Sequence, residues 1–161
     1  MKKLSMIIAL SFVAFAAQAS FAQSQKDLVI RTAHALETAP LDKETARMQF
    51  EAIRWVIETD EVSITVCGNA FGPFLDKKNK ASTEATAAYT IGMAAFKLEH
   101  PEKASDENAA QLAGIETALK LYEAYVKEKP KAKFDPVEGL ITKRNSGELA
   151  AFVAAANCSK K

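Results

Sequence analysis

Residues 85–96, which read ATAAYTIGMAAF, decide the fold because they run for twelve positions without a charged side chain. Ser82 precedes them as a helix N-cap, and the pair His100 and Pro101 ends the segment. A helix with so few charged positions is buried on most of its sides. Twelve residues are too few to cross a bilayer, so we expect this helix inside a helical domain.

Further helices are predicted around this segment from apolar side chains that recur at three- and four-residue steps. They cover residues 24–38, 42–59 and 105–128, a short stretch from residue 135 and a last one from about residue 147. Only 6 glycines and 5 prolines occur in the 161 residues, which disfavours a fold with many turns. We therefore predict a single all-α domain, a bundle of five to six helices.

The predicted helix over residues 42–59 carries a ladder of charges of alternating sign. Its members Arg47, Glu51, Arg54 and Glu58 follow one another at steps of four, three and four residues. Apolar side chains cover the rest, which is more than half of the helix circumference, and this composition predicts that the helix is the centre of the core.

Residues 62–66, VSITV, are the only β-branched run in the chain. Their alternation is compatible with a strand, but no second strand is found to pair with it, so we expect an extended connector or a continued helix. Gly72 and Pro73 then break the chain. Phe71, Phe74 and Leu75 are available to close the base of the core.

Residues 1–22 are predicted to be a secretory signal peptide, and residues 23–161 the mature helical domain. Two lysines precede an apolar run over residues 4–17, and small residues follow that allow cleavage after Ala19 or Ala22. An uncleaved anchor needs a longer apolar run. The expected location is the periplasm or the exterior of a bacterium, with no membrane span after cleavage.

Cys67 and Cys158 are the only cysteines, and in an oxidising compartment an isolated pair is most simply a disulfide. Closing a loop of about 90 residues stabilises an idealised chain by about 4 to 5 kcal/mol. A redox-active pair is the alternative, but the CxxC spacing that lowers the pKa of one thiol is absent.

Charge and motifs exclude several classes of function. The chain has 21 basic and 20 acidic side chains, and a near-neutral balance argues against nucleic acid as a partner. His34 and His100 lie far apart in the sequence, and neither has acidic residues at metal-ligand spacing. No metal site and no cofactor is therefore expected. No P-loop and no GxSxG motif is present.

A stretched helical hairpin resembles part of a tetratricopeptide repeat. Residues 85–96 are similar to the first helix of such a repeat, with Ala88, Ile91 and Gly92 in the corresponding order, and residues 118–130, ALKLYEAYVKEKP, are similar to the second. The interval between them exceeds the 34-residue period. In architecture alone the chain also resembles small secreted helical immunity proteins and acid-stress chaperones that hold their helices with one disulfide.

These observations favour a non-enzymatic interaction protein, a scaffold, inhibitor or immunity-like module that acts through its surface. Tyr89, Tyr122 and Tyr125 on the hairpin are the candidate interaction surface, and another protein is the expected partner. The alternative is a periplasmic carrier of a small ligand, or an enzyme. Either would use the three clustered carboxylates of Glu58, Asp60 and Glu61.

Overall fold

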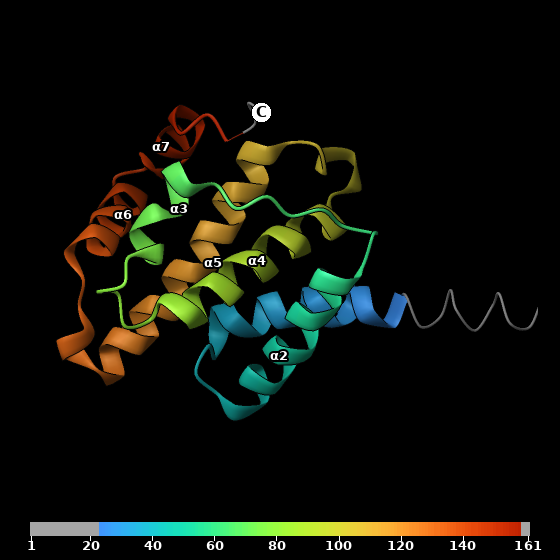
Figure 1. Cartoon of the computed structure of the whole chain (residues 1–161), viewed down its shortest axis with the longest axis horizontal. Helices are drawn as coiled ribbons and strands as arrows, with labels where there is room; N and C mark the ends of the chain where they lie inside the picture. Colours follow the sequence, from blue (N-terminus) through green and yellow to red (C-terminus); the bar gives the residue numbers. More distant parts are fainter. Residues whose placement is uncertain (1–22, 159–161) are drawn as a thin grey trace, which may run out of the picture.

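The computed structural model describes residues 23–158, so the predicted signal peptide lies outside the described residues. Over this range the chain is all-helical, with seven α-helices, two 3-10 turns and no strand (Figure 1). Residues 23–38 form the first helix. The others are α2 (Lys43–Glu58), α3 (Gly68–Leu75), α4 (Ser82–Glu99), α5 (Glu107–Glu128), α6 (Asp135–Asn145) and α7 (Leu149–Ala155), with the 3-10 turns η1 (Pro101–Lys103) and η2 (Pro130–Ala132).

Helices α4 and α5 form the centre of the core and are the most extensively packed pair. Two glycines allow their close approach. A Cβ atom on Gly114 would lie 2.6 Å from Met93 Cγ and 2.8 Å from the Tyr89 carbonyl oxygen, and one on Gly92 would collide with Thr117. Because a backbone oxygen cannot move aside cheaply, the two helices need glycine at these positions.

The prediction that residues 42–59 form the centre of the core is wrong. Helix α2 does form there, and Asp42 caps it by accepting a hydrogen bond from the Glu44 N–H at 2.8 Å. However, α2 lies at the edge of the molecule (Figure 1) and buries only Thr45, Ala52 and Val56. The buried face is narrow because it contacts only the neighbouring helices, chiefly α4.

The predicted count of five to six helices is too low, because α3 forms where Gly72 and Pro73 were expected to break the chain. Burial stabilises this short helix in spite of its proline. Phe71 and Phe74 are fully buried, and the Phe71 ring stacks on Tyr89 with the ring centroids 4.0 Å apart. The two phenylalanines close the core as predicted, since aromatic burial outweighs weak helix propensity here. Leu75, predicted to join them, is instead exposed.

Residues 61–67, which we name the connector, are extended and cross α4 and α5 without pairing to a strand (Figure 1). Buried side chains take the place of the missing strand. The Lys97 ammonium donates to the carbonyl of Ser63 at 2.9 Å, and the Gln111 amide donates to the carbonyl of Thr65 at 2.7 Å.

In the third hydrogen bond between the connector backbone and a buried side chain, the Cys67 N–H donates to the Tyr89 hydroxyl at 3.4 Å. The contacts therefore fall on alternate residues, which is the period of an extended strand. The Tyr89 hydroxyl in turn donates to the side-chain carbonyl of Gln111, so one buried network holds two of the three contacts. This arrangement explains how VSITV is extended although residues 23–158 contain no second strand to pair with it.

The connector ends at Cys67, and α7 ends just before Cys158. The two Cα atoms lie 5.4 Å apart at a sequence separation of 91, a disulfide-bonded geometry that matches the predicted pairing. The Asn69 side chain also donates to the Ala156 carbonyl at 3.2 Å. The C-terminal helix is thus tied to the start of α3.

We expect Gln111→Met to destabilise the protein by about 2 kcal/mol, because it keeps the side-chain length but leaves the Thr65 carbonyl without its side-chain donor and the Tyr89 O–H without an acceptor. Urea denaturation measures the change. The control is Gln49→Met at a half-exposed position of α2, where we expect a loss below about 0.5 kcal/mol. Equal losses in the two variants would contradict the role given to Gln111.

Candidate functional site

Among the described residues, the two large apolar side chains with the highest exposed fractions lie on the outer face of α2. Phe50 is 69% exposed and Ile57 is 76% exposed. They are seven residues apart, and Ile53 lies between them on the same face of the helix. We name these three residues the α2 stripe.

An open groove of about 450 Å³ runs beside the stripe, between α2 and α4. Its α2 wall consists of Ile53 and Ile57. The α4 wall consists of Ser82, Thr83, Thr86, Ala87 and Thr90. The Thr86 hydroxyl donates to the Ser82 carbonyl at 2.7 Å and the Thr90 hydroxyl donates to the Thr86 carbonyl at 3.0 Å. Because both hydroxyls donate to carbonyl groups of α4 itself, the groove presents mainly apolar surface to a binding partner.

The charge ladder lies next to the stripe. Arg47 contacts Glu44 at 2.5 Å and Glu51 at 2.9 Å, and the hydrogen bonds that its guanidinium donates to the Glu44 carboxylate raise the pKa of Arg47. Arg54 and Glu58 are exposed, and neither forms an ion pair with any residue in 23–158. The ladder therefore ends in two exposed charges that have no ionic partner among the described residues.

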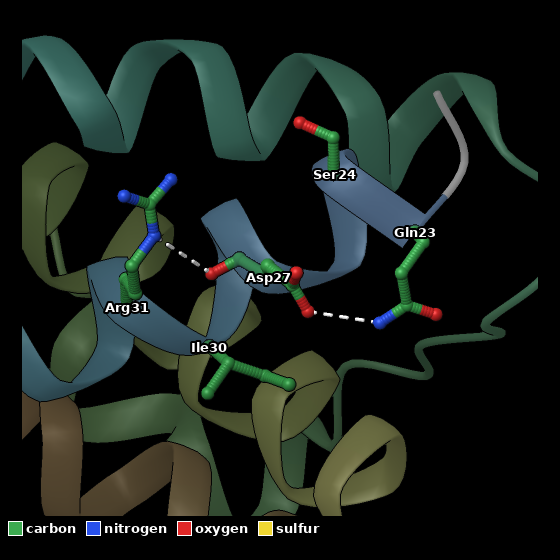
Figure 2. Close-up of a pocket in the computed structure, with 5 residues that line it drawn as sticks. All are labelled: Gln23, Ser24, Asp27, Ile30 and Arg31. Atoms are coloured by element: carbon green, nitrogen blue, oxygen red, sulfur yellow. Dashed lines mark hydrogen bonds between the residues drawn. The ribbon is translucent and has the colours of Figure 1, made fainter. Parts of the chain in front are cut away.

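A larger hollow, of about 620 Å³, is a surface feature of one helix. Figure 2 shows its lining residues Gln23, Ser24, Asp27, Ile30 and Arg31, all from the helix over residues 23–38. Gln23 donates to the Asp27 carboxylate at 2.9 Å, and Arg31 donates to the Asp27 carbonyl at 3.3 Å. No other described element contributes a side chain, so the hollow lacks the converging groups of a ligand site.

A small acidic crevice of about 130 Å³ lies between the helix over residues 23–38, α4 and α5. Its ionisable groups are His34, Glu37, Glu99 and Glu116, and His34 Nε2 lies 3.1 Å from Glu99 Oε1. Desolvation raises the pKa of Glu116, and the nearby Glu37 adds to the shift. Within residues 23–158 no group of three or more His, Cys, Asp or Glu side chains has the arrangement of a metal site.

Two of the three tyrosines predicted as an interaction surface are buried. Tyr89 and Tyr122 have no exposed surface, so the prediction is wrong for them. The face of the hairpin on which they lie is covered by α3, whose Phe74 meets the Tyr122 ring edge-on at 6.5 Å between centroids. Tyr125 is half-buried beneath the Lys129 ammonium, which lies 4.4 Å from the ring centroid.

The three carboxylates of the alternative hypothesis lie at the exposed end of α2. Glu61 forms an ion pair with Lys26, and its backbone N–H donates to the Thr59 hydroxyl at 3.1 Å. Glu58 and Asp60 are exposed and do not join Glu61 in a shared site. A carrier or enzyme that uses these groups stays a prediction.

Sequence reasoning missed the exposure of Phe50 and Ile57 because both look like core residues. The ladder contained the signal that could have found them. Arg54 is four residues after Phe50 and three before Ile57, so all three share one face of the helix. A helix face that carries an arginine is expected to point to solvent, because arginine is rarely buried.

No protein-family model, no curated protein and no solved structure matches the chain. Among residues 23–158, no helix has both the length and the apolar character needed to cross a membrane.

We expect Glu116→Gln to raise the melting temperature at pH 7, because the folded protein penalises the ionised form of Glu116. The pKa of this carboxyl is higher in the folded than in the unfolded chain. The contribution of Glu116 to stability is therefore present at low pH and is lost as the pH rises through the pKa that Glu116 has in the folded protein. The gain in melting temperature of the variant should disappear below pH 4.5, the usual pKa of a glutamate side chain.

Thermal melts between about pH 4 and pH 8 test this expectation. Asp60→Asn is the control, because it neutralises an exposed carboxylate that is already in water. A Glu116→Gln variant that is less stable than the parent protein at pH 7 would contradict the assignment.

Proposed function

We propose that this is an exported, non-enzymatic helical protein that acts by binding another protein through the outer face of α2. The observation that carries the proposal is the exposure of Phe50 and Ile57, at 69% and 76%. Large apolar side chains side by side on a surface are typical of protein interaction sites. The neighbouring groove between α2 and α4 extends the apolar area.

The export part of the proposal rests on the sequence and on the cysteines. Residues 1–22 have the pattern of a signal peptide, and the only two cysteines lie at disulfide distance. A disulfide persists in an oxidising compartment, which is the environment that a signal peptide leads to.

The non-enzymatic part rests on the contacts of the polar groups in the interior. Lys97 pairs with Glu107 at 2.5 Å, and Gln111 and Tyr89 bond to each other and to the connector. These side chains are engaged in holding the backbone. An enclosed pocket of several hundred cubic ångströms with converging polar groups is what a carrier needs, and the larger hollows described here are open grooves.

A photo-crosslinking residue at position 57 tests the proposal in intact cells of the organism that encodes the protein. The control places the same residue at position 75, because Leu75 is also an exposed apolar side chain, at 45%, but lies on α3. We expect a discrete protein adduct from position 57 and none from position 75.

Mass spectrometry of the adduct identifies the captured protein. Equal adducts from both positions, or none from either, would contradict a binding face on α2. A small metabolite retained by the purified protein in native mass spectrometry would favour the carrier instead.

A further inference from the structure

The charge ladder of α2 is complementary to itself when it is reversed. Reading from Arg47 to Glu58 the signs run plus, minus, plus, minus, and the reverse reading gives the opposite sign at every step. Two copies of α2 that lie antiparallel therefore bring Arg47 beside Glu58 of the second copy, and Glu51 beside Arg54 of the second copy. Each of these pairs forms twice because of the two-fold symmetry.

The antiparallel arrangement also gives partners to the charges that lack them. Arg54 and Glu58 are exposed and form no ion pair within residues 23–158. In the antiparallel pair Arg54 meets Glu51, and Glu58 meets Arg47. Arg47 already binds Glu44 and Glu51, but a guanidinium has five N–H donors and can accept a further carboxylate.

The apolar stripe has nearly the same centre as the ladder. The ladder is centred between residues 52 and 53, and the midpoint of Phe50 and Ile57 lies one residue further along the helix. One residue corresponds to about 1.5 Å along the axis. A single two-fold axis therefore places Phe50 against Ile57 of the second copy while it pairs the charges.

A parallel pairing lacks this match. The charge ladder lies on one side of the α2 stripe and the groove lies on the other. In two antiparallel helices the same sides of the two stripes meet, so the ladder of one copy faces the ladder of the other. In two parallel helices opposite sides meet, as residues e and g do in a parallel coiled coil. On α2 the opposite flank borders the groove, whose lining is neutral.

We propose that the partner of the α2 face is a second copy of this chain, bound through antiparallel α2 helices. The inference rests on the proposed function, since it names the partner of the same surface. It adds the orientation, the two kinds of charge pair and the contact between Phe50 and Ile57.

Sedimentation equilibrium of the mature protein, over concentrations from about 1 μM to about 1 mM, tests the dimer. Arg54→Glu places glutamate against Glu51 of the second copy, and Glu51→Arg places arginine against Arg54. We expect each single variant to dimerise about tenfold more weakly than the parent protein. An equimolar mixture of the two variants restores every attractive pair, so we expect a heterodimer of nearly parental affinity.

Lys131→Glu is the control, because it makes the same change in charge as Arg54→Glu at an exposed position in η2. It should leave the dimer unchanged. A parent protein that stays monomeric at every concentration, or a mixture no tighter than the single variants, would overturn the inference. If the protein is monomeric but position 57 cross-links to a different protein, the proposed function stands and only the identity of the partner is wrong.

Discussion

The close approach of α4 and α5 is the constraint on which the rest of the structure depends. Gly92 and Gly114 remove the side chains that would hold the two helices apart. At this distance the Tyr89 hydroxyl on α4 reaches the Gln111 side chain on α5. The pair then presents a donor and an acceptor to the connector at the positions where its backbone needs them. Without that contact the connector would cross the core with unsatisfied backbone groups.

This use of polar side chains accounts for the character of the interior. Lys97, Tyr89 and Gln111 are buried, and residues of these types in a cleft often indicate catalysis. Here each one bonds to the connector backbone. Burial raises the pKa of Tyr89 to about 12, so the phenol stays protonated and keeps its donor for Gln111. The polar core therefore acts as a support for the connector and for the cysteine at its end.

The helical fold could be predicted from the sequence because the helices α4 and α5 have long periodic or uncharged segments. Asp42 and Asp106 also mark helix starts, and both side chains cap as their residue type predicts. The prediction of Ser82 as an N-cap is wrong, because Ser82 lies inside α4 and Ala81 is at the cap position. The short helix α3 could not be predicted, because its stability comes from the burial of Phe71 and Phe74 and not from local propensity.

The candidate site was only partly readable from the sequence. The ladder was visible, but apolar periodicity cannot tell a helix at the centre of a core from one at its edge. The helix over residues 42–59 is therefore predicted at the centre of the core and Tyr89 and Tyr122 at the surface, whereas Phe50 and Ile57 of that helix are exposed and the two tyrosines are buried. The two tyrosines are buried because α3 packs on their face of the hairpin, whereas the face of α2 that carries Phe50 and Ile57 has no such cover among the described residues. Both outcomes depend on contacts between distant segments.

Amide hydrogen exchange at low and high protein concentration tests most directly whether a second copy of the chain binds the outer face of α2. Association through this face predicts slower exchange at high concentration in peptides from Lys43–Glu58, with α5 unchanged. Exchange in α2 that does not depend on concentration, together with slowing that is confined to another helix, would contradict the account.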